Sequence, residues 1–273
     1  MYKTVERVLS EEKIEYFSIV PYSLCKEINA SIRERMDFQP KSAVIYLLPY
    51  YTGEGVNISR YAVSCDYHIA IREIGEALIS ALKEKYPEGH FSSFGDHSPI
   101  DERHAALISG LGIAGDNGLL INEKYGSYVF VGDILTDLEP NEALGFQPRE
   151  IQRCHSCGAC KRACPTRILG GEGEECLSAI TQRKGELADT ERALMVRYNT
   201  AWGCDLCQSV CPYNRSPVMT PIDFFHRERI ECLTLEVLDG MDKETFSRRA
   251  FAWRGRKTVE RNIEILSAVN KGQ

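Results

Sequence analysis

The residues with the clearest chemical meaning are cysteines, and seven of the eleven stand in two short runs. The first run, residues 154–165, reads C-x2-C-x2-C-x3-C-P. This is the spacing with which bacterial proteins bind 4Fe-4S clusters, where three cysteines serve one cluster and the fourth serves another. The second run, residues 204–212, reads C-x2-C-x3-C-P and has Ala201 where one more cysteine would complete the pattern. The two runs therefore predict iron–sulfur chemistry.

Two 4Fe-4S clusters need eight thiolates, and the two runs supply seven. Cys176 is the expected eighth ligand because it lies between the runs. One cluster is then assigned to Cys154, Cys157, Cys160 and Cys211. The other is assigned to Cys164, Cys176, Cys204 and Cys207. A single 3Fe-4S cluster is the alternative if Cys176 lies elsewhere.

Other uses of cysteine fit the sequence less well. Zinc sites usually take paired C-x2-C knuckles rather than these runs, and a disulfide framework is typical of small secreted chains. Cys25, Cys65 and Cys232 are interpreted first as small buried hydrophobic residues.

Composition limits the class of protein further. The 273 residues allow one or two domains, and the net charge of −6 argues against a surface that is basic throughout. No apolar run approaches the roughly 18 residues of a membrane span, and the charged N-terminus does not resemble a secretory signal. We therefore expect a cytoplasmic protein without a membrane segment.

The first half of the chain must position whatever the clusters reduce. Helical spacing of apolar residues predicts helices over residues 1–13, 67–85 and 105–111. Apolar runs predict strands over residues 43–48, 118–122 and 128–131. We expect an α+β fold with three parts: an α/β domain for cofactor and substrate (1–150), a double 4Fe-4S ferredoxin-like module (151–215) and a helical C-terminal segment packing on the other two (216–273).

Several blocks in a fixed order carry a resemblance to a known family. Those before the first cysteine run are residues 59–62, 66–68, 95–103, 110–112, 126–127 and 132–136. Those after it are residues 176–178, 203–208 and 211–214. Together they resemble epoxyqueuosine reductase, the cobalamin-dependent enzyme that completes queuosine in tRNA, over residues 40–270. The chain ends at Gln273, where the family's C-terminal helical-repeat extension would begin, so we expect a short form.

The resemblance implies a nitroreductase-like domain that binds cobalamin and receives electrons from the clusters. It implies a two-electron removal of the epoxide oxygen with Asp96 as proton donor, because Asp96, Pro99, Glu102 and Arg103 match the family's V-D-x-x-P-x-x-E-R block. It also implies cobalamin contacts at Ser178, Cys204 and Asp205. An external electron donor such as a flavodoxin or ferredoxin is expected.

Two features leave alternatives open. Asp96 could instead cap the helix that begins near Pro99, since aspartate is a common N-cap. Asp116 stands where the family usually has lysine, which favours a substrate other than tRNA. The alternatives are therefore a corrinoid reductase of a small molecule, or an electron-transfer protein that reduces a partner's corrinoid.

A basic strip from Arg248 to Arg261 favours an RNA substrate instead. Its cations are Arg248, Arg249, Arg254, Arg256, Lys257 and Arg261. Because Phe251 and Trp253 lie among these cations, the strip could bind phosphates and stack a base. The alternative is an ordinary solvated helix face around a buried tryptophan.

Overall fold

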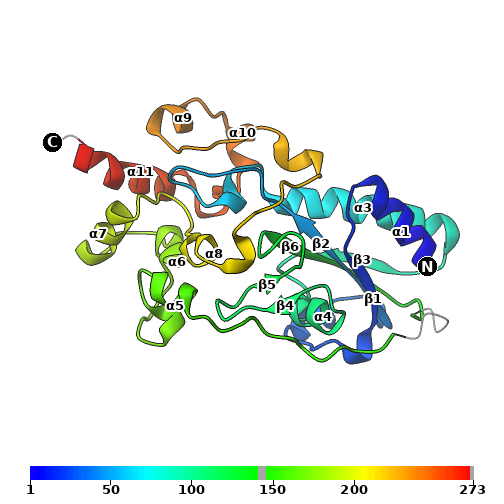
Figure 1. The fold of residues 1–273 in the computed structure, drawn as a ribbon. Coiled ribbons are helices and arrows are strands. Elements are labelled where there is room, and N and C mark those ends of the chain that lie inside the picture. The colour runs from blue at the N-terminus through cyan, green and yellow to red at the C-terminus, as the bar shows by residue number, and fades with distance from the viewer. Residues whose placement is uncertain (141–145, 271–273) are drawn as a thin grey trace. The chain divides into compact units, whose positions relative to one another are not determined.

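The computed structural model describes residues 1–140 and 146–270 (Figure 1). It divides the chain into two compact units. Unit 1 comprises Met1–Pro49 and His68–Ser156, and unit 2 comprises Tyr50–Tyr67 and Cys157–Gln273. This differs from the three expected segments, because residues 50–67 belong with the cysteine-rich half and the C-terminal segment shares a unit with the cluster module. Residues 141–145 of the expected first domain and 271–273 of the expected last segment lie outside the described residues.

A four-stranded antiparallel sheet, in the order β1-β2-β6-β3, forms the centre of unit 1. Its strands are β1 (Phe17–Pro21), β2 (Ser42–Pro49), β3 (Phe91–Phe94) and β6 (Val129–Thr136). A two-stranded sheet adds β4 (Ile113–Ala114) and β5 (Leu120–Ile121). Strand β2 is buried at every position, which indicates that both faces of the sheet are covered. The apolar run at 43–48 is confirmed as a central strand.

Helices cover the two faces of this sheet. They are α1 (Tyr2–Glu11), α2 (Ala30–Arg33), α3 (Tyr67–Lys85) and α4 (Glu102–Ile108), with the 3-10 turn η1 (Tyr22–Leu24). Helix α4 packs through Ala105, Ala106 and Leu107 on the face that carries Ile45 and Leu135. In Figure 1, α1 and α3 lie on the opposite face. The predicted helices at 1–13 and 67–85 are confirmed, and the third begins three residues before the predicted start.

Unit 2 is built from short helices around a separate core. Its α-helices are α5 (Ala159–Ala163), α6 (Leu177–Gln182), α7 (Asp189–Arg197), α8 (Leu206–Ser209), α9 (Leu235–Asp239), α10 (Lys243–Ser247) and α11 (Arg256–Asn270). Its 3-10 turns are η2 (Arg60–Ala62), η4 (Ile168–Gly170), η5 (Pro212–Asn214), η6 (Asp223–His226) and η7 (Ala252–Arg254). Trp202 and Phe251 are fully buried at the centre, with Ile58 and Val63 of the 50–67 segment beside them.

The described helices include none with both the length and the apolar character needed to cross a membrane.

Candidate functional site

The cysteines of the two runs lie on neighbouring short helices of unit 2. Cys160 is on α5 and Cys207 is on α8, and these two helices pack against each other. Gly158, immediately before α5, has a φ of +73°, a conformation that glycine adopts at little cost. The tight loop that cluster ligands need is therefore present.

All four cysteines assigned to one cluster belong to unit 2. Cys164, Cys176, Cys204 and Cys207 carry free thiols. Burial raises the pKa of Cys204 to about 11 and that of Cys207 to about 12. The charges of Cys176 and Cys164 act on Cys204, and those of Cys204, Cys176 and Cys160 act on Cys207. Thiols with raised pKa values, such as those of Cys204 and Cys207, become thiolates when a metal ion coordinates them.

No three Cys, His, Asp or Glu side chains in residues 1–140 and 146–270 converge as ligands for one metal ion. A 4Fe-4S cluster takes one cysteine per iron, so its ligands need not converge on one point. Cys154 belongs to unit 1, and the assignment of all eight cysteines to two clusters remains a prediction from spacing.

Asp116 lies beside the first cysteine run within unit 1. Its backbone N–H donates to Sγ of Cys154 at 3.3 Å, and its carboxylate accepts from Oγ of Ser156 at 3.3 Å. The residue that departs from the family pattern therefore adjoins a predicted cluster ligand.

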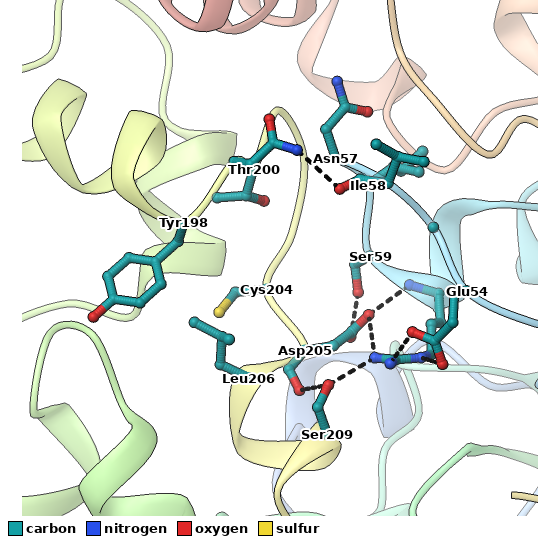
Figure 2. A pocket seen from close by; sticks show the side chains of 14 residues that line it. Glu54, Asn57, Ile58, Ser59, Tyr198, Thr200, Cys204, Asp205, Leu206 and Ser209 are labelled. Atoms are coloured by element: carbon teal, nitrogen blue, oxygen red, sulfur yellow. Dashed lines mark hydrogen bonds and ion pairs between the residues drawn. The ribbon is translucent and has the colours of Figure 1, made fainter.

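Asp205 is the centre of a polar network that joins the 50–67 segment to α8. Its carboxylate accepts from Oγ of Ser59 at 2.5 Å and from the backbone N–H of Arg60 at 2.7 Å, and the Arg60 guanidinium lies 3.3 Å away. Figure 2 shows this network lining a pocket of about 160 Å³, with the Cys204 thiol turned away from Ser59. Gly203 allows this approach, because a Cβ there would lie 2.4 Å from Cβ of Ser59.

Ser178 lies in a second cavity of unit 2, of about 420 Å³, whose lining includes Cys176, Arg183, Lys184 and Arg254. Its hydroxyl accepts from Nε2 of Gln182 at 3.1 Å. The structure thus places Ser178 in one cavity with a predicted cluster ligand and three cations.

Asp96 occupies a strained position in unit 1, directly after β3 and Gly95. Its φ is +62°, in the left-handed region that residues other than glycine adopt only at a cost, and such residues cluster at functional sites. Its side chain is 65% exposed, and Nε2 of His68 lies 3.9 Å from its Oδ2. The capping alternative is wrong: Asp101 is the N-cap of α4 and accepts from the backbone N–H of His104 at 2.9 Å.

Two adjacent carboxyl groups lie close to Asp96, one of them fully buried and the other half-buried. Asp133 of β6 is fully buried, and Glu102 is the first residue of α4. Burial, followed by the charge of Asp133, raises the pKa of Glu102, and burial raises the pKa of Asp133. A detectable signal existed, because Asp133 is the one charged residue in the strand sequence VFVGDILT.

The basic strip is not one cationic face, so that prediction is corrected. Arg249 is buried and donates to the carbonyl of Glu228. Arg256 is paired with Glu260 and Asp239 and donates to the carbonyl of Leu238. Arg261 donates to the carbonyls of Arg183 and Gly185. These arginines therefore serve within unit 2 as donors to backbone carbonyl groups.

Trp253 and Arg254 remain as a surface feature of that strip. Trp253 is 59% exposed, and the guanidinium of Arg254 lies 3.7 Å from the centre of its ring.

Known proteins resemble this chain both in its cysteine-rich segment and over most of its length. Residues 153–214 match the family model of the 4Fe-4S double cluster binding domain. The epoxyqueuosine reductase of Listeria monocytogenes is 31% identical, over 96% of this chain and 73% of its own length. That of Cyclobacterium marinum is 30% identical over 83% and 76%. That of Staphylococcus aureus is 33% identical over 74% of this chain, which spans only 54% of that relative.

Solved structures share the fold. A selenomethionine-labelled epoxyqueuosine reductase aligns with a TM-score of 0.79 at 24% identity, covering 98% of this chain and 80% of that one. An epoxyqueuosine reductase with an epoxyqueuosine-modified tRNA-Tyr stem loop aligns with a TM-score of 0.74 at 23% identity, covering 98% and 81%. With the double-cluster match and the relatives above, the chain belongs to the epoxyqueuosine reductase family of oxidoreductases.

Proposed function

We propose that this chain reduces epoxyqueuosine in tRNA to queuosine. The reaction takes up two electrons and two protons, converts the epoxide to an alkene and releases the oxygen as water. The observation that carries the proposal is the match to the Listeria monocytogenes epoxyqueuosine reductase over 96% of this chain. The tRNA stem loop present in one structure with the same fold supports the class of substrate.

The cofactors that we propose are two 4Fe-4S clusters and cobalamin. The clusters take the two cysteine sets given above, one with Cys154 and Cys211 and the other with Cys176 and Cys204. Bound cobalamin supplies the electrons at the carbon–oxygen bond. Unit 1 is proposed to be the nitroreductase-like part that the resemblance implies.

We propose that Ser178 and the Cys204–Asp205 segment hold cobalamin. Ser178 has a half-buried hydroxyl at the cavity of about 420 Å³, which supports a contact through its side chain. The carboxylate of Asp205 already accepts from Ser59 and Arg60, so this segment would use backbone groups.

Asp96 is the proposed proton donor. Breaking a carbon–oxygen bond leaves negative charge on oxygen, which a positioned acid neutralises as it forms. The exposed carboxyl on a strained loop supports this role, and so does the assignment of the helix cap to Asp101. The imidazole of His68 lies 3.9 Å from this carboxyl, close enough to form an ion pair with it when the imidazole is protonated.

The proposed RNA contact is the Trp253–Arg254 pair. An exposed indole can stack on an unpaired base, and a guanidinium lying over it can reach a phosphate. A flavodoxin or ferredoxin remains the proposed class of electron donor.

A product assay tests the proposal. Protein loaded anaerobically with iron, sulfide and cobalamin, and reduced chemically, is given a stem loop carrying epoxyqueuosine, and queuosine is measured by mass spectrometry. We expect conversion over many turnovers. Cobalamin reduction without queuosine would instead favour the small-molecule or the electron-transfer alternative. Turnover of an aryl halide would then support the first, and reduction of a partner corrinoid protein would support the second.

A further inference from the structure

The adjacent carboxyl groups of Glu102 and Asp133, close to Asp96, point to a residue with a specific task. We propose that Glu102 is a neutral positioning residue for Asp96. Glu102 shares one proton with Asp133 and holds the backbone of Asp96 in its left-handed conformation. This inference rests on the proposed role of Asp96 as proton donor.

The first observation is the bond between the two residues. The backbone N–H of Asp96 donates to Oε1 of Glu102 at 3.2 Å. A residue in the left-handed region costs free energy and persists only where its surroundings fix it. This hydrogen bond ties the strained backbone of Asp96 to the first turn of a helix, α4, whose apolar side is buried.

The second observation is that Asp133 needs a donor. Its Oδ2 accepts from Oγ of Ser98 at 3.2 Å. Its Oδ1 is buried and has no hydrogen bond from a described N–H or hydroxyl group. Because the side chains of Asp133 and Glu102 adjoin, a proton on Glu102 would supply the missing donor. Two adjacent carboxylates, one fully buried and one half-buried, would repel each other without that proton.

The surroundings favour retention of the proton. Asp133 lies on the sheet face covered by α4, opposite Ile45 of β2 and Phe94 of β3. The titratable groups that act on the pair are Asp96 on its loop and Cys25 after η1, whereas Tyr46 lies on the opposite face of β2. None of these three carries a positive charge, so none of them would stabilise a second carboxylate. The direction of the pKa shifts of both carboxyls agrees with this geometry.

Two substitutions separate this role from others. Glu102→Gln keeps an oxygen for the Asp96 N–H and offers an amide donor to Asp133, as a protonated glutamate does. Glu102→Ala removes both. Glu73→Gln, at an exposed position of α3, is the matched control. All variants are compared as fully loaded enzymes with equal iron and cobalamin.

We expect Glu102→Gln to keep turnover within about threefold of the parent. We also expect turnover of the parent to fall at alkaline pH as Glu102 loses its proton, and turnover of Glu102→Gln to lack this fall. We expect Glu102→Ala to lower kcat at least tenfold with KM unchanged. Equal losses of turnover in Glu102→Gln and Glu102→Ala would show that the ionised carboxylate is needed. Full activity of Glu102→Ala would show that turnover does not need Glu102 to position Asp96. Either result overturns the inference.

An infrared measurement decides the protonation independently of turnover. The parent-minus-Glu102→Gln difference spectrum at pH 8 should contain a protonated-carboxyl C=O band that the control variant retains. Absence of that band overturns the inference even in an active enzyme. If instead the parent converts no epoxyqueuosine while the band is present, the proposed function fails and the shared proton stands.

Discussion

The backbone N–H of Arg60 donates to the carboxylate of Asp205 at 2.7 Å, across 145 positions of sequence. This bond, with that from Ser59, fixes the 50–67 segment to the helix that carries Cys207. The segment thus belongs to the cysteine-rich unit although it precedes most of unit 1 in sequence. Asp205 therefore has a structural task whatever else it contacts.

Removing Asp205 should loosen that attachment. The side chains of Asp205 and Arg60 are each only 10% exposed, so Asp205→Ala leaves a nearly buried guanidinium without this carboxylate. We expect the free energy of unfolding of the loaded protein to fall by about 3 kcal/mol, measured by anaerobic denaturant titration. Ser209→Ala, which removes a weaker Arg60 contact, is the control and should cost about 1 kcal/mol or less. Equal stability of Asp205→Ala and the parent would contradict this account.

Iron content tests the role of Cys176. The parent should bind about eight irons, and Cys176→Ala should lose or degrade one cluster and spare the other. Iron and acid-labile sulfide assays, with electron paramagnetic resonance of the reduced protein, measure this. Cys232→Ala is the control and should keep the parental iron content. An unchanged spectrum in Cys176→Ala would place the eighth ligand elsewhere.

Salt-dependent binding tests the RNA surface. Trp253→Ala should weaken binding of a tRNA stem loop by about 1–3 kcal/mol, the usual value for one base stacked on an aromatic ring. Arg254→Ala should flatten the salt dependence by about one phosphate contact. Lys3→Ala, at an exposed position of α1, is the control. If neither Trp253→Ala nor Arg254→Ala changes affinity, RNA binds elsewhere.

The carboxyl pair makes stability depend on pH in a definite direction. The pKa of Glu102 is raised in the folded protein by burial and by Asp133, and that of Asp133 is raised by burial. The folded state therefore retains protons that the unfolded chain releases above about pH 4–5. The stabilising contribution is complete below that range and is lost as pH rises through the raised values.

Glu102→Gln cannot lose that proton. Relative to the parent, its free energy of unfolding should therefore increase by at least about 1 kcal/mol between pH 5 and pH 9, measured by denaturant titration. Glu73→Gln should show the same pH dependence as the parent. A constant difference between Glu102→Gln and the parent across this range would contradict the raised pKa.

Local pattern was sufficient for much of the fold. The run at 43–48 became the central strand because every position is apolar, and the spacing at 67–85 became α3 because its apolar residues recur on one helix face. The apolar spacing at 105–111 predicts a helix but not its start, because α4 begins at Glu102, directly after its N-cap Asp101. The grouping of residues 50–67 with unit 2 depends on bonds such as Ser59–Asp205, which join distant parts of the chain and leave no local pattern.

The candidate site was predictable where chemistry imposes spacing. The cysteine runs follow from the geometry of a cluster, and Asp96 came from the family block rather than from its own surroundings. Charge counting misled at the strip from Arg248 to Arg261, because burial of Arg249 and the carbonyl contacts of Arg256 and Arg261 depend on tertiary packing. The Glu102–Asp133 pair cannot be predicted from local sequence, because the two carboxyl groups come together only when α4 packs on β6.

The most direct test of the central claim is turnover of epoxyqueuosine by Asp96→Asn. A general acid contributes about 10²–10⁴-fold to a rate, or roughly 3–5 kcal/mol of barrier. We expect queuosine formation to fall by a factor in that range while iron content, cobalamin binding and cobalamin reduction stay at parental levels. Asp101→Asn, the matched change at the neighbouring helix cap, should keep turnover and leave stability nearly unchanged, because asparagine caps helices about as well as aspartate. Parental turnover in Asp96→Asn would contradict the assignment of Asp96 as proton donor.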